Sequence, residues 1–203
     1  MSADTRTRNQ YFDHSTIEKF VFGYANEVSQ ALKNLDFRAI ESLVRLLDEA
    51  RKQHRTVWVA GNGGSLAIAE HLCCDWTKGI QHSDKPFLKV QSLCSSGPLT
   101  TAISNDLSYA DVFSEQVKMF CEKGDVLILI SSSGNSANVC KAADAAHSRG
   151  LKTVTFTGFT GGKLKEMSDL NIHVSVSNYG VVEDVHQMIM HIVAQFSYLQ
   201  DRG

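Results

Sequence analysis

The sequence predicts an α/β fold, a three-layer αβα sandwich built on a five-stranded parallel sheet. Five short apolar runs support this prediction, each followed by small or polar residues and then by a helix-like segment. The runs cover residues 56–60, 87–93, 125–131, 152–158 and 171–177. Strands that alternate with helices pair in parallel, and the helices then cover both faces of the sheet.

Helical periodicity marks both ends of the chain. From about residue 14 to residue 54, apolar residues recur at intervals of three and four, with a break near residues 34–36. We expect this segment to form an N-terminal helical hairpin packed on the core. A long amphipathic helix is expected over residues 181–201. Its predicted buried stripe consists of Val182, Val185, Ile189, Ile192, Val193, Phe196 and Leu199.

Length and composition are typical of a single globular domain over residues 1–203. No linker, low-complexity tract or internal repeat interrupts the apolar pattern, and 43% of the residues are hydrophobic. A net charge of -2 with scattered basic residues argues against nucleic acid or a membrane surface as a partner. No apolar run approaches the ~20 residues that span a bilayer, and the first ten residues are polar. We therefore expect a cytoplasmic protein.

Two loops after predicted strands are rich in glycine and hydroxyl groups. "GNGGS" (61–65) follows the first run, and "SSSGNS" (131–136) follows the third. Neither fits a nucleotide motif, because Leu66 breaks G-x-G-x-x-G and no G-K-[ST] is present. Helix N-termini of this kind bind anions through free N–H groups. An ordinary capped helix start, with Ser65 and Ser136 as N-caps, explains either loop alone. Two such loops on one sheet favour a phosphate site for a small molecule.

Four segments carry a family resemblance. "GNGGS", "SNDLSYADVF", "SSSGNSANV" and "TVTFTGFTGGKL" resemble the sugar isomerase (SIS) domain proteins, and within them the phosphoheptose (sedoheptulose 7-phosphate) isomerases. The likeness covers nearly the whole chain. It implies a five-stranded parallel sheet, a homotetramer with active sites at subunit interfaces, and an aldose–ketose isomerisation. The implied substrate contacts are Asn62, Gly63, Gly64, Asn105, Asp106, Ser131, Ser132, Ser133 and Ser136, to which the first loop adds Ser65.

His71 and Asp75 follow the first loop and lie four residues apart, so on a helix they share a face. By spacing alone, a surface pair explains them as well as a metal site does. The resemblance implies a His and a Glu here as zinc ligands, with the Glu also transferring protons. Asp75 keeps the carboxylate but places it one methylene, roughly 1.5 Å, closer to the backbone.

The last helix departs from the family pattern. The resemblance implies a Gln and, eight residues later, a His as the remaining metal ligands. We match these positions to His186 and Ala194, so one ligand is changed and one is lost. His71, Asp75 and His186 are then the expected zinc ligands, and Asp75, His186 or Glu183 the expected proton carrier. A core histidine bonded to a carbonyl is the alternative for His186. We expect His191 to face elsewhere.

These observations favour an isomerase that converts sedoheptulose 7-phosphate to an aldose heptose 7-phosphate through an enediol. Two alternatives stay open. One is a SIS protein without catalysis that binds phosphosugars or serves as a regulatory scaffold. The other is an isomerase of a different phosphosugar.

Overall fold

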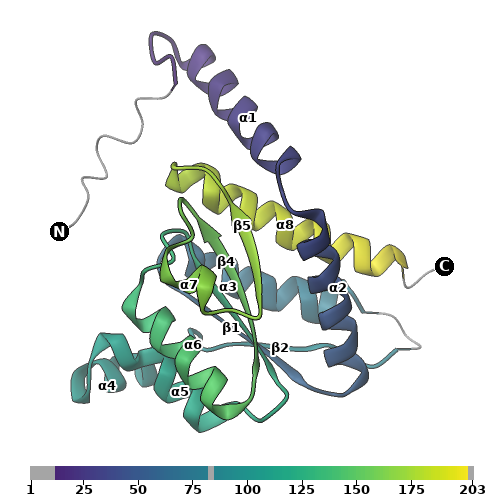
Figure 1. The fold of residues 1–203 in the computed structure, drawn as a ribbon, viewed down its shortest axis with the longest axis vertical. Coiled ribbons are helices and arrows are strands. Elements are labelled where there is room, and N and C mark those ends of the chain that lie inside the picture. Colours follow the sequence, from purple (N-terminus) through teal and green to yellow (C-terminus); the bar gives the residue numbers. More distant parts are fainter. Residues whose placement is uncertain (1–11, 82–84, 201–203) are drawn as a thin grey trace.

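A five-stranded parallel sheet forms the centre of the molecule in the computed structural model, which describes residues 12–81 and 85–200 (Figure 1). The strand order is β2-β1-β3-β4-β5, and every neighbouring pair is parallel. All six residues of β3 are buried, as expected for a central strand covered on both faces. The strands are β1 (Thr56–Gly61), β2 (Lys89–Ser92), β3 (Val126–Ser131), β4 (Lys152–Gly158) and β5 (Leu170–Val174).

Helices cover both faces of this sheet, which confirms the predicted three-layer αβα fold (Figure 1). One layer contains α2 (Phe37–Lys52), α3 (Gly64–Cys74) and α8 (Tyr179–Gln200). The other contains α4 (Gly97–Asp106), α5 (Val112–Phe120), α6 (Ala137–Arg149) and the short α7 (Gly162–Glu166). Two short turns complete the described elements, namely η2 (Asp75–Gly79), a π-helix that continues α3, and η3 (Tyr109–Asp111), a 3-10 helix before α5.

Alternation along β3 divides the interior into two cores. Ile128 and Ile130 face the layer of α2, α3 and α8, whereas Leu127 and Leu129 face the layer of α4 to α7. Each face of the central strands is therefore covered, and exposed strand residues lie mainly at the sheet edge formed by β2. The strand-to-helix loops at the carboxyl ends are left as the place for a ligand.

The N-terminal helices do not fold back on each other as the predicted hairpin would. The break lies where expected, because Asp36 caps α2 by accepting hydrogen bonds from the N–H groups of Arg38 and Ala39. However, α1 (Ile17–Lys33) packs against α8 rather than along α2, and Figure 1 shows it extending beyond the body of the molecule. Tyr24 anchors it by donating a 2.6 Å hydrogen bond to Asp184.

The buried stripe predicted for the last helix holds for four of its seven residues, because Val182, Val185, Ile189 and Val193 are buried. Ile192 lies between two of these along the chain but is turned away from the core. Phe196 and Leu199 lie in the last turns of α8, which continue past the sheet (Figure 1). Ile192, Phe196 and Leu199 are 47%, 49% and 63% exposed.

The described helices include none long and apolar enough to cross a membrane. The polar first ten residues, which contributed to the expected cytoplasmic location, lie outside the described part of the chain.

Candidate functional site

The two serine- and glycine-rich loops meet at the carboxyl edge of the sheet. They follow β1 and β3, which are neighbours, and lead into α3 and α6. A small pocket of about 120 Å³ lies between them. Its lining contains seven of the predicted site residues, Glu183 among them, together with two further residues. The lining consists of Asn62, Ser65, Ile130, Ser131, Ser132, Ser133, Ser136, Tyr179 and Glu183.

The helix starts at this pocket are not capped by side chains. Gly63 and Ser136 are the N-cap residues of α3 and α6, and neither makes a side-chain capping hydrogen bond. Ser132 Oγ is buried and has no hydrogen-bond partner among the described residues. Free donors around a small concave space are what a phosphate group requires. The structure therefore differs from the ordinary capped helix starts that were the alternative for these loops.

Glu183 places a carboxylate at the same pocket. It is the fifth residue of α8, and its carboxyl group lies so close to Gly64 that a Cβ atom there would overlap it and displace the side chain. Burial, and to a lesser degree the nearby charge of Asp184, raises the pKa of Glu183. A negative charge at this place opposes a bound phosphate, and the raised pKa favours the neutral form.

Asn62 joins the two loops through residues that the sequence did not single out. Its amide forms a reciprocal pair of 2.9 Å hydrogen bonds with the amide of Asn138 on α6. Tyr109 also donates its hydroxyl to Asn62 Oδ1 at 2.7 Å. Both partners lie within the motifs "SSSGNSANV" and "SNDLSYADVF", which were the only signal for them.

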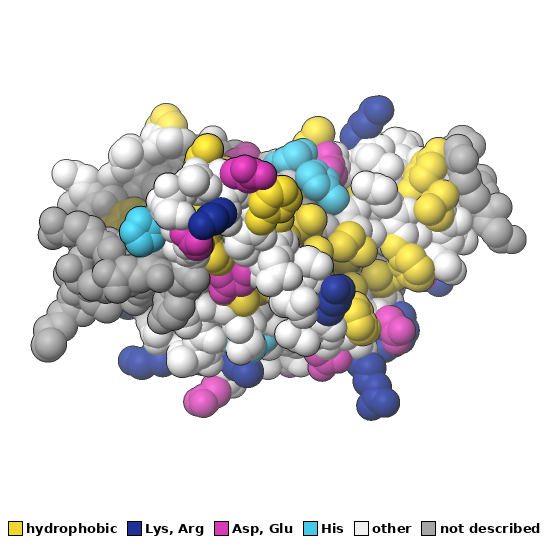
Figure 2. Space-filling view, turned by 90° about the horizontal axis from the view of Figure 1, so that it is seen from above, with side chains coloured by type: hydrophobic (Ala, Val, Ile, Leu, Met, Phe, Trp, Pro, Cys, Tyr) yellow, Lys and Arg dark blue, Asp and Glu magenta, His cyan; other side chains and the backbone are white. Residues whose placement is uncertain are grey.

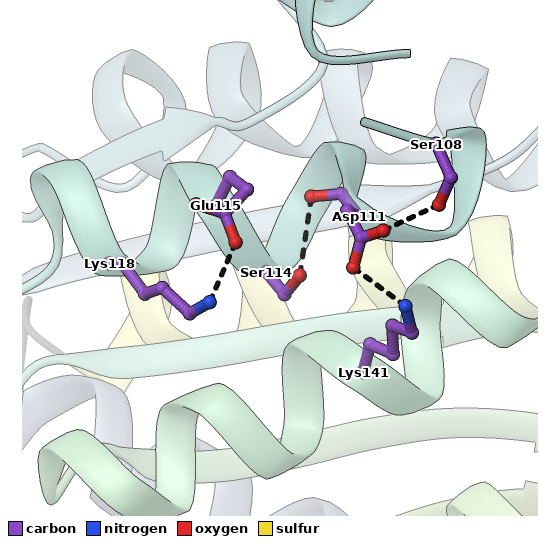
Figure 3. Close-up of polar contacts among 6 residues, drawn as sticks. All are labelled: Ser108, Asp111, Ser114, Glu115, Lys118 and Lys141. Carbon is purple, nitrogen blue, oxygen red and sulfur yellow. Dashed lines mark hydrogen bonds and ion pairs between the residues drawn. The ribbon is translucent and has the colours of Figure 1, made fainter. Parts of the chain in front are cut away.

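The turn that carries Tyr109 is itself fixed on α6 (Figure 3). Asp111 accepts hydrogen bonds from Lys141 at 2.7 Å and from Ser108 at 2.5 Å. The hydrogen bond from Lys141 is the main reason that the pKa of Asp111 is lowered. These contacts keep η3 beside the first loop.

Asn105 and Asp106 do not join this pocket within the chain. They end α4, are exposed, and are hydrogen-bonded to each other at 2.9 Å. Neither is among the residues that line the pocket between the serine loops.

Farther along α3 and α8, His71, Asp75 and His191 form a second cluster. His71 Nε2 lies 3.5 Å from Asp75 Oδ1, and His191 Nε2 lies 3.4 Å from Asp75 Oδ2. One ligand atom of each residue lies within 4.8 Å of those of the other two. Figure 2 shows histidine side chains gathered at the surface beside an acidic one. An open pocket of about 320 Å³ reaches Asp75 and His191 from the side of Tyr198.

His186 is absent from this cluster, which corrects its expected role as a zinc ligand and proton carrier. Its side chain is fully buried, with Nε2 3.2 Å from the carbonyl oxygen of Thr157 and the ring edge-on to Phe156. Burial lowers the pKa of His186 to about 4. On a helix, five residues rotate a side chain by about 140°, so His186 and His191 point in different directions. The core histidine, which was the alternative, is what the structure contains.

His191 takes the place that was assigned to His186, although the sequence predicted that it faces elsewhere. Glu183 and His191 are eight residues apart, the spacing that the resemblance implies for its Gln and His. When the match is moved three residues toward the N-terminus, the two positions fall on Glu183 and His191 instead of His186 and Ala194. Ala194 instead lines the open pocket beside His191.

Comparisons with known proteins show the family to which the chain belongs. A model of the SIS domain family matches residues 22–158. The phosphoheptose isomerase of Helicobacter pylori (strain P12) is 34% identical over 177 residues, which cover 87% of this chain and 91% of that protein. The phosphoheptose isomerase of Aeromonas salmonicida (strain A449) is 37% identical over 167 residues, covering 82% and 83%.

A solved structure shares the whole fold. Phosphoheptose isomerase GmhA from Neisseria gonorrhoeae matches with a TM-score of 0.81 and 29% identity, covering 90% of this chain and 98% of that one. The resemblance seen in the sequence is thus confirmed, and the chain belongs to the SIS domain family and, within it, to the phosphoheptose isomerases.

Proposed function

We propose that this chain is an aldose–ketose isomerase that converts sedoheptulose 7-phosphate to an aldose heptose 7-phosphate through an enediol. The observation that carries the proposal is the presence, along one pair of helices, of an anion pocket and of a histidine–carboxylate cluster. The names of the relatives, phosphoheptose isomerases, support the same substrate.

The distance between the two sites fits a seven-carbon sugar. Glu183 at the pocket and His191 at the cluster are eight residues apart on α8, or ~12 Å at 1.5 Å per residue. An extended seven-carbon chain measures roughly 10 Å from C1 to the phosphorus, at about 1.25 Å of length per bond. A phosphate held by the serine loops would therefore place C1 and C2 beside His191. A five-carbon sugar phosphate would fall short.

In this proposal the serine loops are the phosphate handle. Ser131, Ser132, Ser133 and Ser136 supply hydroxyl donors, and the N-termini of α3 and α6 supply backbone N–H groups. The handle fixes the reacting carbons against the cluster, which turns the proton transfer into a reaction between positioned groups. Among the described residues, no lysine or arginine lines this pocket, so in this proposal the affinity for phosphate rests on oriented dipoles.

The cluster fits a zinc-like ion. Two imidazoles and one carboxylate are donors that zinc prefers, and three protein ligands with an open position are typical of catalytic zinc sites. We propose His71, Asp75 and His191 as its ligands, with His191 in place of the buried His186. Such an ion stabilises negative charge on the substrate oxygen as the enediol forms.

The position of each acidic or basic group narrows the choice of proton carrier. His186 is sealed in the core, and Glu183 lies at the phosphate end of the site. Asp75 and His191 lie at the other end, where C1 and C2 would be. We propose that one of these two residues moves the proton between the carbons.

The homotetramer and the cytoplasmic location stay proposals. Figure 2 shows apolar side chains exposed on one face of the molecule. Both α1 and α8 carry exposed apolar residues, among them Ile17 and Phe22 on α1 and Leu199 on α8. A second copy covering this face would also cover the open pocket beside His191. Assembly would thus close the site, as the resemblance implies. A charged phosphosugar does not cross membranes unaided. An enzyme that acts on a phosphosugar made in the cytoplasm is therefore expected in the cytoplasm as well.

Proton NMR in D₂O tests the proposed reaction. The zinc-loaded protein is incubated with sedoheptulose 7-phosphate, fructose 6-phosphate and ribulose 5-phosphate in turn. We expect deuterium exchange at the carbon next to the carbonyl and an aldose product, fastest with the seven-carbon ketose. Faster exchange with a shorter sugar would indicate another phosphosugar. Binding without exchange of any of them would indicate a regulatory protein.

A further inference from the structure

Gln187 is a second side chain of α8, besides His191, that faces the cluster. It lies one turn before His191, and its Nε2 atom is 2.9 Å from Nδ1 of His71. The same atom is 3.4 Å from Nε2 of His191. Gln187 thus contacts both histidines of the cluster, although neither the sequence pattern nor the resemblance pointed to it.

The two ring nitrogens of His71 have different partners. Nδ1 faces the amide of Gln187, whereas Nε2 faces the carboxylate of Asp75. When Gln187 donates an N–H group to Nδ1, the neutral ring carries its proton on Nε2 and directs it at Asp75. In this tautomer Nε2 is protonated and cannot bind a metal.

A metal at the cluster requires the other tautomer. Only an imidazole nitrogen without a proton binds a metal, so the proton of His71 then lies on Nδ1. Metal-bound histidines donate this second N–H group to a nearby acceptor. Gln187 supplies one when its amide turns by half a rotation, because the carbonyl oxygen then replaces the NH₂ group.

We propose that Gln187 is a positioning residue that holds His71 in either tautomer and whose amide turns when a metal binds. This inference rests on the metal site of the proposed function. Glutamine suits the task because its amide is both a donor and an acceptor. A leucine at this position is neither, and a glutamate carboxylate is only an acceptor.

Zinc affinity tests the proposal without reference to turnover. Competition with a chromophoric chelator is measured at about pH 8, where histidine, with an ordinary pKa of about 6.5, is neutral. Gln187→Leu should bind zinc roughly 10- to 100-fold more weakly than the wild type. Gln187→Glu should bind at least as tightly. Gln200→Leu, the same change in the exposed last turn of α8, should leave the affinity unchanged.

NMR of nitrogen-15-labelled protein shows directly which ring nitrogen of His71 carries the proton. The His71 signals are identified as those that disappear in the His71→Asn variant. In the wild type the proton should lie on Nε2 before zinc is added and on Nδ1 afterwards. In Gln187→Glu it should lie on Nδ1 in both states. Equal zinc affinities of wild type and Gln187→Leu, or a tautomer that zinc does not change, would overturn the role of Gln187 and leave the metal site standing. A wild-type protein that binds no zinc would overturn the metal site as well.

Discussion

The phosphate pocket and the histidine–carboxylate cluster lie on the same pair of helices but are built differently. The pocket is formed mainly by loops that leave two neighbouring strands, so chain order alone places its residues. The cluster is formed by side chains on helix faces, where each residue turns the direction by about 100°. For the pocket, an error of a few residues in matching the sequence to the family pattern still selects residues of the same loop. For the cluster, such an error exchanges His191, a residue of the surface cluster, for His186, a residue of the core.

The largest expected effect is a loss of kcat on replacement of His191, which replacement of His186 should not cause. His191→Ala should lower kcat by about 10²- to 10⁴-fold, the contribution of a positioned acid–base group, and should weaken zinc binding. His186→Ala is the matched control and should keep zinc binding and most of kcat in the folded fraction. Steady-state kinetics and a zinc titration on both variants decide the matter. If His186→Ala loses zinc and His191→Ala does not, the assignment from the structure is wrong.

The second effect concerns stability in acid. His186 is neutral in the fold with a pKa of about 4, whereas an unfolded histidine has a pKa of about 6.5. The unfolded chain therefore binds the extra proton first. The stability that the neutral ring contributes is complete above pH 6.5 and is lost as the pH falls toward 4.

The loss in the free energy of unfolding should reach about 3 kcal/mol. Urea unfolding at several pH values measures it, with His186→Gln as the comparison because that side chain does not titrate. The two proteins should diverge in pH dependence only below about pH 6.5. Parallel curves would show that His186 is not buried as described.

The contrast between the sites also shows how far the sequence determined the structure. The alternation of apolar runs with helix-like segments predicted five parallel strands and both loops correctly, and the apolar run of β3 is buried on both faces as expected. The sequence could not show that α1 packs against α8 instead of α2. The spacing of apolar residues predicts which face of a helix is buried, but not which other helix covers that face. The same limit hid Asn138, whose role depends on its contact with Asn62 across the two loops.

A third prediction examines the pocket through Ser132. Its hydroxyl is buried without a partner among the described residues, so it costs stability in the free protein and is available to a phosphate. Ser132→Ala should raise KM by about 10- to 100-fold, the value of a hydrogen bond to a charged group. Its melting temperature should stay equal or rise. Ser148→Ala, an exposed change on α6, should alter neither quantity.

An unchanged KM together with a lower melting temperature in Ser132→Ala would contradict the phosphate assignment. The hydroxyl would then be a structural group whose partner the free protein supplies.

The smallest expected effect comes from Glu183, whose carboxylate would repel the phosphate. Glu183→Gln should lower KM about fivefold, corresponding to roughly 1 kcal/mol of Coulomb repulsion at a partly screened site. Because the pKa of Glu183 is raised, repulsion should grow as the pH rises through that pKa, and the advantage of the variant should grow with it. Glu122→Gln, an exposed change before β3, should leave KM unchanged. A higher KM in Glu183→Gln would show that the carboxylate helps to bind substrate.

The location of the metal tests the account most directly. Crystals of the zinc-loaded protein, measured at the zinc absorption edge, should show anomalous density between His71, Asp75 and His191. Density at the serine pocket, beside His186, or at none of these places would contradict the assignment of the two sites.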